Sequence, residues 1–151
     1  MTRAAQATAH GTDLDGDLVA LQVDTTGAAP LAWADTEPSA GHLVVASHGD
    51  GSIAIGNVSA TNRRFPGPRG RSIANAIEHT ASLARGASGG PVVDVDGRLV
   101  AINTNRTEAG YQAISLVGSA RSRIESLIAG HSFHRRHLGV ALAPADVTTA
   151  V

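Results

Sequence analysis

The segment from residue 86 to residue 103 places the strongest constraint on how this 151-residue chain can fold. It opens with a glycine-rich turn, Gly86-Ala87-Ser88-Gly89-Gly90. Two apolar, β-branched runs follow from Pro91, and Asp96-Gly97 joins them. An Asp-Gly pair between two such runs is a strong signal for a β-hairpin. Pro91 and the hairpin together argue against a helix after the turn, so the turn leads into antiparallel strands.

Short apolar runs alternate with turn residues along most of the remaining chain, at the spacing of an all-β barrel or sandwich. We expect further strands over residues 17–23, 42–47, 52–58, 72–78 and 111–116, and a loop over residues 62–70. The only helical periodicity comes late, where Ala120, Ile124, Leu127 and Ile128 share one face. Ser119 or Ser122 can cap the start of this helix and Gly130 can end it.

Composition narrows the class of protein further. Hydrophobic residues make up 42% of the chain but aromatic residues only 3%, so the core must be aliphatic. With no cysteine, a disulfide framework and a cysteine-based metal site are excluded. A net charge of −1 gives no electrostatic case for nucleic acid, and the arginines of the 62–70 loop and Arg71 are interpreted as solvated, with an acidic partner as the alternative. No run approaches the ~20 apolar residues of a membrane helix, and residues 1–8 lack the apolar core of a signal peptide.

Ser88 is the candidate nucleophile. A serine hydroxyl needs a nearby base to become reactive, and the oxyanion that forms needs N–H donors, which Gly86 and Ser88 can supply from the backbone. Two other interpretations are possible for this turn. The turn also fits the G-x-S-x-G elbow of α/β-hydrolases, but that serine lies between a strand and a helix. The plainest alternative is a glycine-rich turn around an ordinary serine.

The turn and three further segments resemble the trypsin-like serine proteases, and within them the HtrA/Deg branch. Residues 17–23 (Asp-Leu-Val-Ala-Leu-Gln-Val) are similar to the strand that begins with the triad aspartate. Residues 110–115 (Gly-Tyr-Gln-Ala-Ile-Ser) resemble the segment that lines the primary specificity pocket, and residues 137–140 (His-Leu-Gly-Val) resemble the stretch that leads into a PDZ domain. The resemblance implies an all-β fold, namely a chymotrypsin-like C-terminal β-barrel with one C-terminal helix and with the first barrel largely missing.

The resemblance also implies roles and domains. Ser88 would attack the scissile carbonyl, Gly86 and Ser88 would hold the oxyanion, and Asp17 would be the triad acid. A pocket for small aliphatic side chains of unfolded proteins would be bordered by Leu83, Ala84, Tyr111, Gln112, Ala113 and Ile114. Residues 1–16 would be a remnant of the first barrel and would keep one of its strands. Residues 17–130 would form the second barrel with its helix. Residues 131–151 would be a linker and the truncated start of a PDZ domain. No metal or organic cofactor is implied, and for the family a cell-envelope or periplasmic location is expected.

The chain departs from the family at the general base. In trypsin-like proteases the triad histidine precedes the aspartate by a few tens of residues, whereas only 16 residues precede Asp17. The upstream histidine, His10, lies in a segment that matches a strand, so we expect the base to be missing. His42, His48 and His79 lie in or beside strands, and His79, nearest in sequence to Ser88, is a weak substitute.

Two substitutions in the nucleophile loop and two metal patterns complete the expectations. Ala87 stands where the family has asparagine and its digestive relatives have aspartate, whose carboxylate locks the oxyanion loop, so this loop lacks that clamp. Arg85 stands where the family often has proline, so a restraint on φ is lost and a charge is added beside the pocket. The alternating Asp13, Asp15 and Asp17 lack the glycine of a calcium loop, and the histidines at 131, 134 and 137 lie in a probable linker, so no structural metal site is expected.

Two functional classes remain open. One is a serine endopeptidase domain that acts on unfolded or extended polypeptides. The other is a non-catalytic pseudoprotease that binds peptides or a partner. Loss of the first barrel would expose an apolar face, which predicts self-association.

Overall fold

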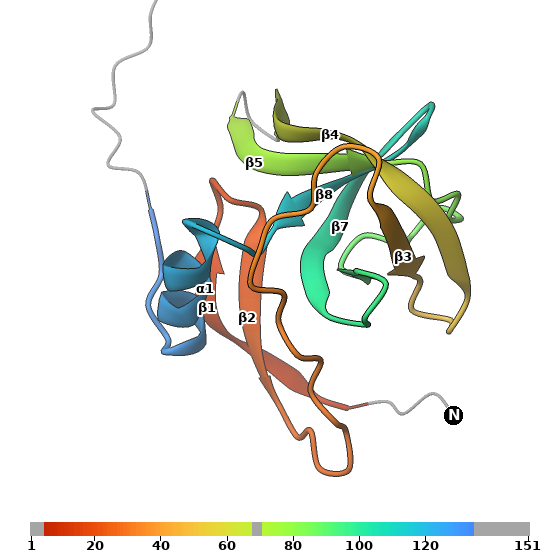
Figure 1. Ribbon diagram of the computed structural model, residues 1–151. Helices are drawn as coiled ribbons and strands as arrows, with labels where there is room; N and C mark the ends of the chain where they lie inside the picture. Colours follow the sequence, from red (N-terminus) through yellow and green to blue (C-terminus); the bar gives the residue numbers. More distant parts are fainter. Residues whose placement is uncertain (1–4, 68–70, 135–151) are drawn as a thin grey trace, which may run out of the picture.

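Six antiparallel strands close into a barrel in the computed structural model, which describes residues 5–67 and 71–134 (Figure 1). The strands follow one another around the barrel in the order β3-β4-β5-β8-β7-β6. Their bounds are β3 (Leu43–Ser47), β4 (Ile53–Pro66), β5 (Ser72–His79), β6 (Pro91–Val93), β7 (Leu99–Thr107) and β8 (Gly110–Ser115). The predicted all-β barrel is therefore confirmed.

The two strongest turn signals in the sequence form hairpins. Strands β6 and β7 pair across the Asp96-Gly97 turn, where Gly97 has a φ of 76°, a conformation that glycine adopts at little cost. Strands β3 and β4 pair from Leu43 opposite Asn57 to Ser47 opposite Ile53, and residues 48–52 form the turn. These hairpins place the Gly-rich turn at one end of the barrel, between β5 and β6.

A second, two-stranded sheet lies outside the barrel. Strands β1 (Ala7–Asp13) and β2 (Leu18–Val23) form an antiparallel hairpin, and helix α1 (Ala120–Ile128) packs against both (Figure 1). Gly11 allows this close approach, because a Cβ there would come within 2.3 Å of the Leu127 carbonyl oxygen. One strand was expected in residues 1–16, and β1 lies there; strand β2, which was assigned with the second barrel, pairs with β1 instead of joining the closed barrel.

The structure differs from the expectation of a loop over residues 62–70, because part of this segment belongs to a strand. Strand β4 continues to Pro66 and pairs with β5, with register shifts on both sides of Arg63. Asn62 has a φ of 52°, which marks one of these irregularities. Arg63 lies 3.3 Å from the Glu78 carboxylate on β5, so opposite charges across the two strands support pairing where sequence polarity suggested a loop.

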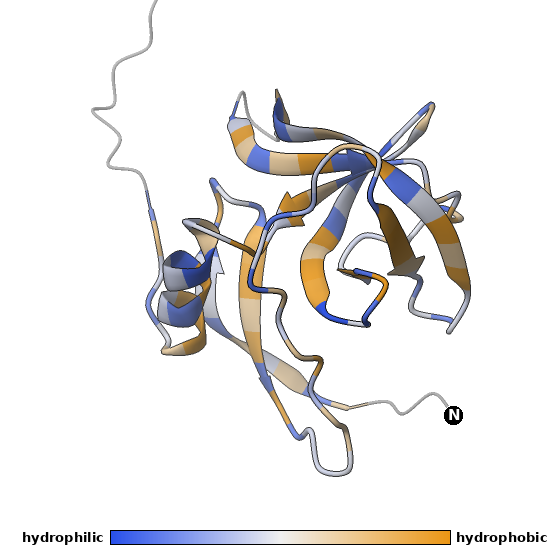
Figure 2. Cartoon of the chain, viewed as in Figure 1, coloured by the Kyte–Doolittle hydropathy of each residue, from blue (hydrophilic) through white to orange (hydrophobic). Residues whose placement is uncertain are grey.

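The barrel core is aliphatic, as the composition predicts, with Tyr111 as its aromatic member among the described residues. Its fully buried side chains include Val44, Val58, Ile77 and Val92. Burying a side chain of this size contributes roughly 1.5–3 kcal/mol. Hydrophobic residues are spread over the barrel strands and along β2 (Figure 2).

Strand β2 leaves much of its apolar surface uncovered, as do Leu43 on β3 and Ile53 and Ile55 on β4. Val19 and Leu21 are 51% and 55% exposed, and both lie on the same face because alternate residues of a strand point the same way. The hairpin therefore presents an apolar strip to solvent.

Helix α1 begins after Ser119, whose side chain makes no capping hydrogen bond, and ends before Gly130, which has a φ of 89°. Ile124 and Leu127 are buried as expected, whereas Ile128 is 57% exposed. No helix in the described ranges is both long and apolar enough to span a membrane. The predicted linker motif at residues 137–140 lies outside the described residues.

Candidate active site

The Gly-rich turn forms a tight loop that presents Ser88 at the surface. Gly86 and Gly89 have φ values of 92° and 85°, and the Gly90 N–H donates to the Ala87 carbonyl at 3.0 Å. Gly90 lies against β3, where a Cβ would come within 2.1 Å of the Ser47 carbonyl oxygen. These glycines are needed because the backbone bends through left-handed conformations and packs directly on a neighbouring strand.

Thr104 on β7 brings the predicted nucleophile and the predicted acid together. The Ser88 hydroxyl donates to the Thr104 carbonyl oxygen at 2.6 Å. The Thr104 hydroxyl donates a short hydrogen bond to the Asp17 carboxylate. Ser88 and Asp17 are 71 positions apart in the sequence, yet both hydrogen-bond to Thr104, Ser88 to its main chain and Asp17 to its side chain.

Asp17 is held at the end of the β1–β2 hairpin. It adopts a φ of 55° in the turn, a conformation that costs free energy for a residue other than glycine. The turn is supported by the buried Asp13, whose carboxylate accepts the Gly16 N–H at 2.9 Å and a bidentate pair of hydrogen bonds from Arg123 on α1. Burial alone would raise the pKa of the Asp13 carboxyl, but the Arg123 and Gly16 hydrogen bonds outweigh it and the pKa falls below the ordinary value.

Two backbone donors near Ser88 are available for an oxyanion. Within the ranges that the structure describes, neither the Gly86 N–H nor the Ser88 N–H donates to a protein acceptor. Free N–H groups beside a nucleophile can stabilise the negative charge of a tetrahedral intermediate.

None of the described histidines hydrogen-bonds to Ser88 or Asp17. His42 accepts the Ser39 N–H, and His131 contacts the Ser126 carbonyl. His10 lies at the end of α1, about 3.0 Å from where a Cβ of Gly130 would be. His48 contacts the Arg85 carbonyl oxygen at 3.2 Å, beside the nucleophile loop.

His79, the nearest histidine in sequence to Ser88, is a core residue. It is 1% exposed, stacks on Tyr111 and shares a 2.8 Å hydrogen bond with the side chain of Asn103. Burial lowers the pKa of this imidazole, and the Asn103 hydrogen bond only partly opposes the shift. The His79 Nδ1 and Asn103 Nδ2 atoms have no hydrogen-bond partner among the described residues. A buried, neutral imidazole in the barrel interior explains why proximity in sequence does not bring it to the hydroxyl.

Of the six residues predicted to border the specificity pocket, Leu83 and Tyr111 line a common pocket. The Tyr111 hydroxyl donates to the Ala84 carbonyl at 2.7 Å, and a small pocket of about 110 Å³ is lined by Leu83 and Tyr111 together with residues 80–82 and 106–110. Ala113 packs in the core beside Tyr111.

The other two predicted pocket residues lie elsewhere. The Gln112 side chain donates to Glu78 on β5, and Ile114 packs with Phe65 and Ile73 in a second cluster. Ile114 also borders a separate cavity of about 590 Å³ between the hairpin, α1 and the barrel. The reason is the alternation of a strand, which sends neighbouring side chains to opposite faces.

The described residues contain no group of three or more histidine, aspartate or glutamate side chains that could hold a metal ion. Of the alternating aspartates, Asp13 pairs with Arg123, Asp15 lies 3.7 Å from Arg71, and Asp17 accepts from Thr104. Two of the three histidines of the C-terminal pattern, His131 and His134, are described, and His137 is outside the described residues.

Residues 2–102 match the sequence profile of the trypsin-like peptidase domain. The chain belongs to this family. Among curated relatives it is similar to the chloroplastic protease Do-like 5 of Arabidopsis thaliana, with 33% identity over 62% of this chain and 31% of that protein. It is also similar to a probable periplasmic DegP-like serine endoprotease of Halomonas elongata, with 29% identity over 94% of this chain and 31% of that protein. The chain thus spans about a third of the length of these relatives.

Solved structures agree with this membership. The HtrA-type protease AlgW, solved with a decapeptide, superposes with a TM-score of 0.72 and 26% identity over 85% of this chain and 42% of that chain. The resemblance to the HtrA/Deg branch is confirmed. The fold is a chymotrypsin-like β-barrel with a single C-terminal helix, and the chain is an HtrA-like, trypsin-type serine protease domain.

Sequence reasoning missed Thr104. It is a hydroxyl residue after the run Leu99–Asn103, and nothing in its local pattern separates it from any other strand threonine. Its position opposite the nucleophile loop depends on the pairing of β6 with β7, where Gly89 donates to Asn103 at 2.7 Å. A search for a polar residue at the end of the post-nucleophile hairpin could have found it.

Proposed function

We propose that this chain is the nucleophile-bearing barrel of an HtrA-like serine endopeptidase, with Ser88 as nucleophile and Asp17 as triad acid but without a general base of its own. The observation that carries the proposal is the Thr104 bridge, which holds the Ser88 hydroxyl and the Asp17 carboxylate at one residue of β7. In a complete site, Ser88 would attack the carbonyl, Asp17 would orient a histidine, and the Gly86 and Ser88 N–H groups would hold the oxyanion.

The missing base follows from what Ser88 contacts. Its hydroxyl donates to a carbonyl oxygen, which is far too weak a base to remove the proton. None of the described histidines hydrogen-bonds to Ser88 or Asp17. Without a base, serine at neutral pH is a poor nucleophile, so we expect no peptide hydrolysis by the chain alone.

The proposed substrate is an extended polypeptide. AlgW, a structural neighbour, was solved with a decapeptide, and the pocket beside Leu83 and Tyr111 is small. Its lining is mostly polar and includes Ser82, Arg106 and Glu108, so the preference for short aliphatic side chains rests on the family resemblance alone. The non-catalytic alternative is a module that binds such a peptide without cleaving it, and the occupied Ser88 hydroxyl favours that alternative for the isolated chain.

Self-association is part of the same proposal. Val19, Leu21 and Val23 leave an apolar strip on β2, and Leu14 in the turn is 48% exposed. Apolar surface of this kind is typical of a protein interface. We expect concentration-dependent dimers or larger species in light scattering, whereas a strictly monomeric chain at all concentrations would count against this part.

Cleavage of fluorescently labelled unfolded casein tests the catalytic part. We expect the wild-type chain and Ser88→Ala to release the same background signal. A hybrid in which the histidine-bearing first barrel of a relative precedes the present barrel should gain cleavage that Ser88→Ala abolishes. A folded hybrid without such cleavage would contradict the role of Ser88, and cleavage by the chain alone would contradict the missing base.

A further inference from the structure

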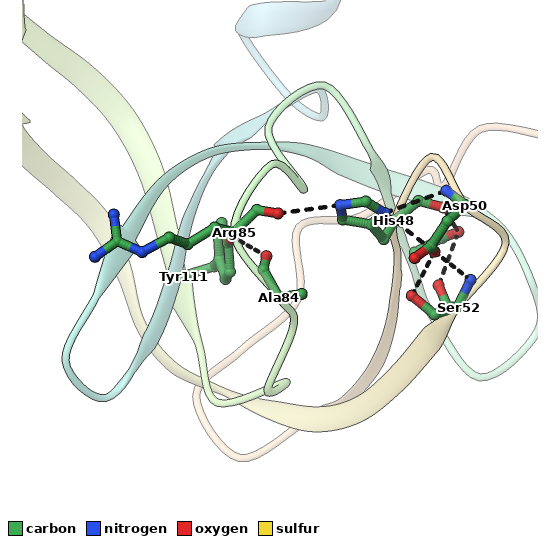
Figure 3. A network of polar contacts seen from close by, with 7 residues as sticks. His48, Asp50, Ser52, Ala84, Arg85 and Tyr111 are labelled. Carbon is green, nitrogen blue, oxygen red and sulfur yellow. Dashed lines mark hydrogen bonds and ion pairs between the residues drawn. The ribbon is translucent and has the colours of Figure 1, made fainter.

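His48 makes a contact that joins the β3–β4 turn to the nucleophile loop. Its Nε2 atom lies 3.2 Å from the carbonyl oxygen of Arg85, the residue before Gly86 (Figure 3). The two residues are 37 positions apart in the sequence. A Cβ on Gly86 would lie 3.3 Å from the same Nε2 atom, so the imidazole rests directly against the loop.

The partners of His48 fix which ring nitrogen carries the proton. A carbonyl oxygen only accepts, so Nε2 must be the donor to Arg85. The other nitrogen, Nδ1, faces both the Asp50 N–H at 3.1 Å and the Asp50 carboxylate at 3.0 Å. The neutral ring accepts the N–H, and the protonated ring donates to the carboxylate. Both forms keep a proton on Nε2.

Asp50 is itself held in place. Its carboxylate accepts the Ser52 hydroxyl at 2.6 Å and the Ser52 N–H at 2.8 Å (Figure 3). These hydrogen bonds lower the pKa of the Asp50 carboxyl. The turn therefore presents His48 to the loop through a chain of hydrogen bonds that starts at Ser52.

The orientation of the Arg85 carbonyl decides where the next N–H points. In a trans peptide the carbonyl and the following N–H point in opposite directions, and the described chain contains no cis peptide. A carbonyl held by His48 therefore turns the Gly86 N–H away from His48. In the described residues, the Arg85 carbonyl has no other hydrogen bond and the Gly86 N–H has none. The Ala87 side chain packs in the core but has no polar group that could hold this peptide, and Gly86 permits many conformations.

We propose that His48 is a positioning residue that fixes the Arg85–Gly86 peptide so that the Gly86 N–H stays available to the oxyanion. This role rests on the proposed function, since only a protease-type site uses that N–H. It supplies from the β3–β4 turn the restraint that Ala87 does not supply within the loop.

Two NMR measurements on the ¹⁵N-labelled chain test the proposal without any need for cleavage. Long-range ¹H–¹⁵N spectra should show His48 with a proton on Nε2 in the wild-type chain. The Gly86 amide should give one sharp cross-peak that His48→Ala broadens or removes, because the peptide then exchanges between orientations on the μs–ms timescale. His48→Gln, which keeps a side-chain N–H donor, should restore the peak at least in part, and the exposed His42→Ala is the matched control.

A neutral His48 that carries its proton on Nδ1 would overturn the proposal, and this result needs no variant. So would a Gly86 peak with unchanged position and width in a folded His48→Ala chain. Either result leaves the Ser88 proposal untouched, because casein cleavage by the hybrid tests that independently. Conversely, if the hybrid shows no Ser88-dependent cleavage, the spectra expected for His48 and Gly86 in the present chain stay the same.

Discussion

The Arg123–Asp13 pair ties the hairpin that carries Asp17 to helix α1, and its loss should be costly. The Asp13 side chain has no exposed surface, whereas the Arg123 side chain is 46% exposed. Arg123→Ala would leave a buried carboxylate with the backbone N–H groups of Gly16 and Asp15 as its remaining hydrogen-bond donors. Removing one partner of a buried pair costs about 3–5 kcal/mol. Because the guanidinium is half exposed, we expect the low end, about 3 kcal/mol in the free energy of unfolding.

The size of the effect can be measured against a neighbour on the same helix. Arg121 pairs with Glu125 one turn away, and both side chains are exposed, at 45% and 63%. Such surface pairs contribute less than about 1 kcal/mol, so Arg121→Ala is the matched control. For a chain of this length, a loss of about 3 kcal/mol lowers Tm by roughly 6–12 °C.

Urea unfolding followed by far-UV circular dichroism is the suitable assay. Tryptophan fluorescence is less suitable because Arg121 lies over the ring of Trp33, 5.4 Å from its centroid, and the control would change the signal directly. A second variant, Asp13→Asn with Arg123→Ala, should recover part of the lost stability because no buried charge remains. If Arg123→Ala loses no more stability than Arg121→Ala, the argument from the buried carboxylate is refuted.

Three further outcomes are expected. Burial lowers the pKa of His79 in the folded chain, so as the pH falls below its ordinary value of about 6.5 the unfolded chain takes up the proton first. Stability therefore falls by up to about 1.4 kcal/mol per pH unit until the lowered pKa of the folded chain is reached, and His79→Gln should remove this slope from urea titrations. Gly90→Ala should lose the native fold or several kcal/mol of stability through collision with the Ser47 carbonyl, whereas Gly49→Ala, with open space around it, should unfold at nearly the wild-type urea concentration. Thr104→Val removes the hydroxyl that donates to the acid, and hydrogen exchange should speed up in the β1–β2 turn but not in β7; equal rates in the turn would count against the bridge.

Features encoded by a few neighbouring residues were predicted well from the sequence. The Asp96-Gly97 turn, the turn at residues 49–51 and the end of α1 at Gly130 depend on local backbone conformation, which glycine permits. The Ser88 loop was found for the same reason. Its spacing of glycines has few alternative uses.

Features that depend on tertiary pairing were not predicted. Strand β4 continues through polar residues because β5 supplies partners such as Glu78 for Arg63, and β2 pairs with β1 instead of joining the barrel. The Thr104 bridge and the His48 contact each join segments far apart in the sequence. No local periodicity records such contacts, since they arise only once the barrel has closed.

The most direct test of the missing base is the reaction of the purified chain with a fluorophosphonate, read as intact mass, with Ser88→Ala as control and an intact relative as positive control. Fluorophosphonates modify a serine only when a base activates it, so a single turnover is enough to show activation. We predict an unchanged mass for a folded wild-type chain under conditions that label the relative completely. The addition of one phosphonyl group that Ser88→Ala abolishes would contradict this account and would show that a histidine of this chain activates Ser88.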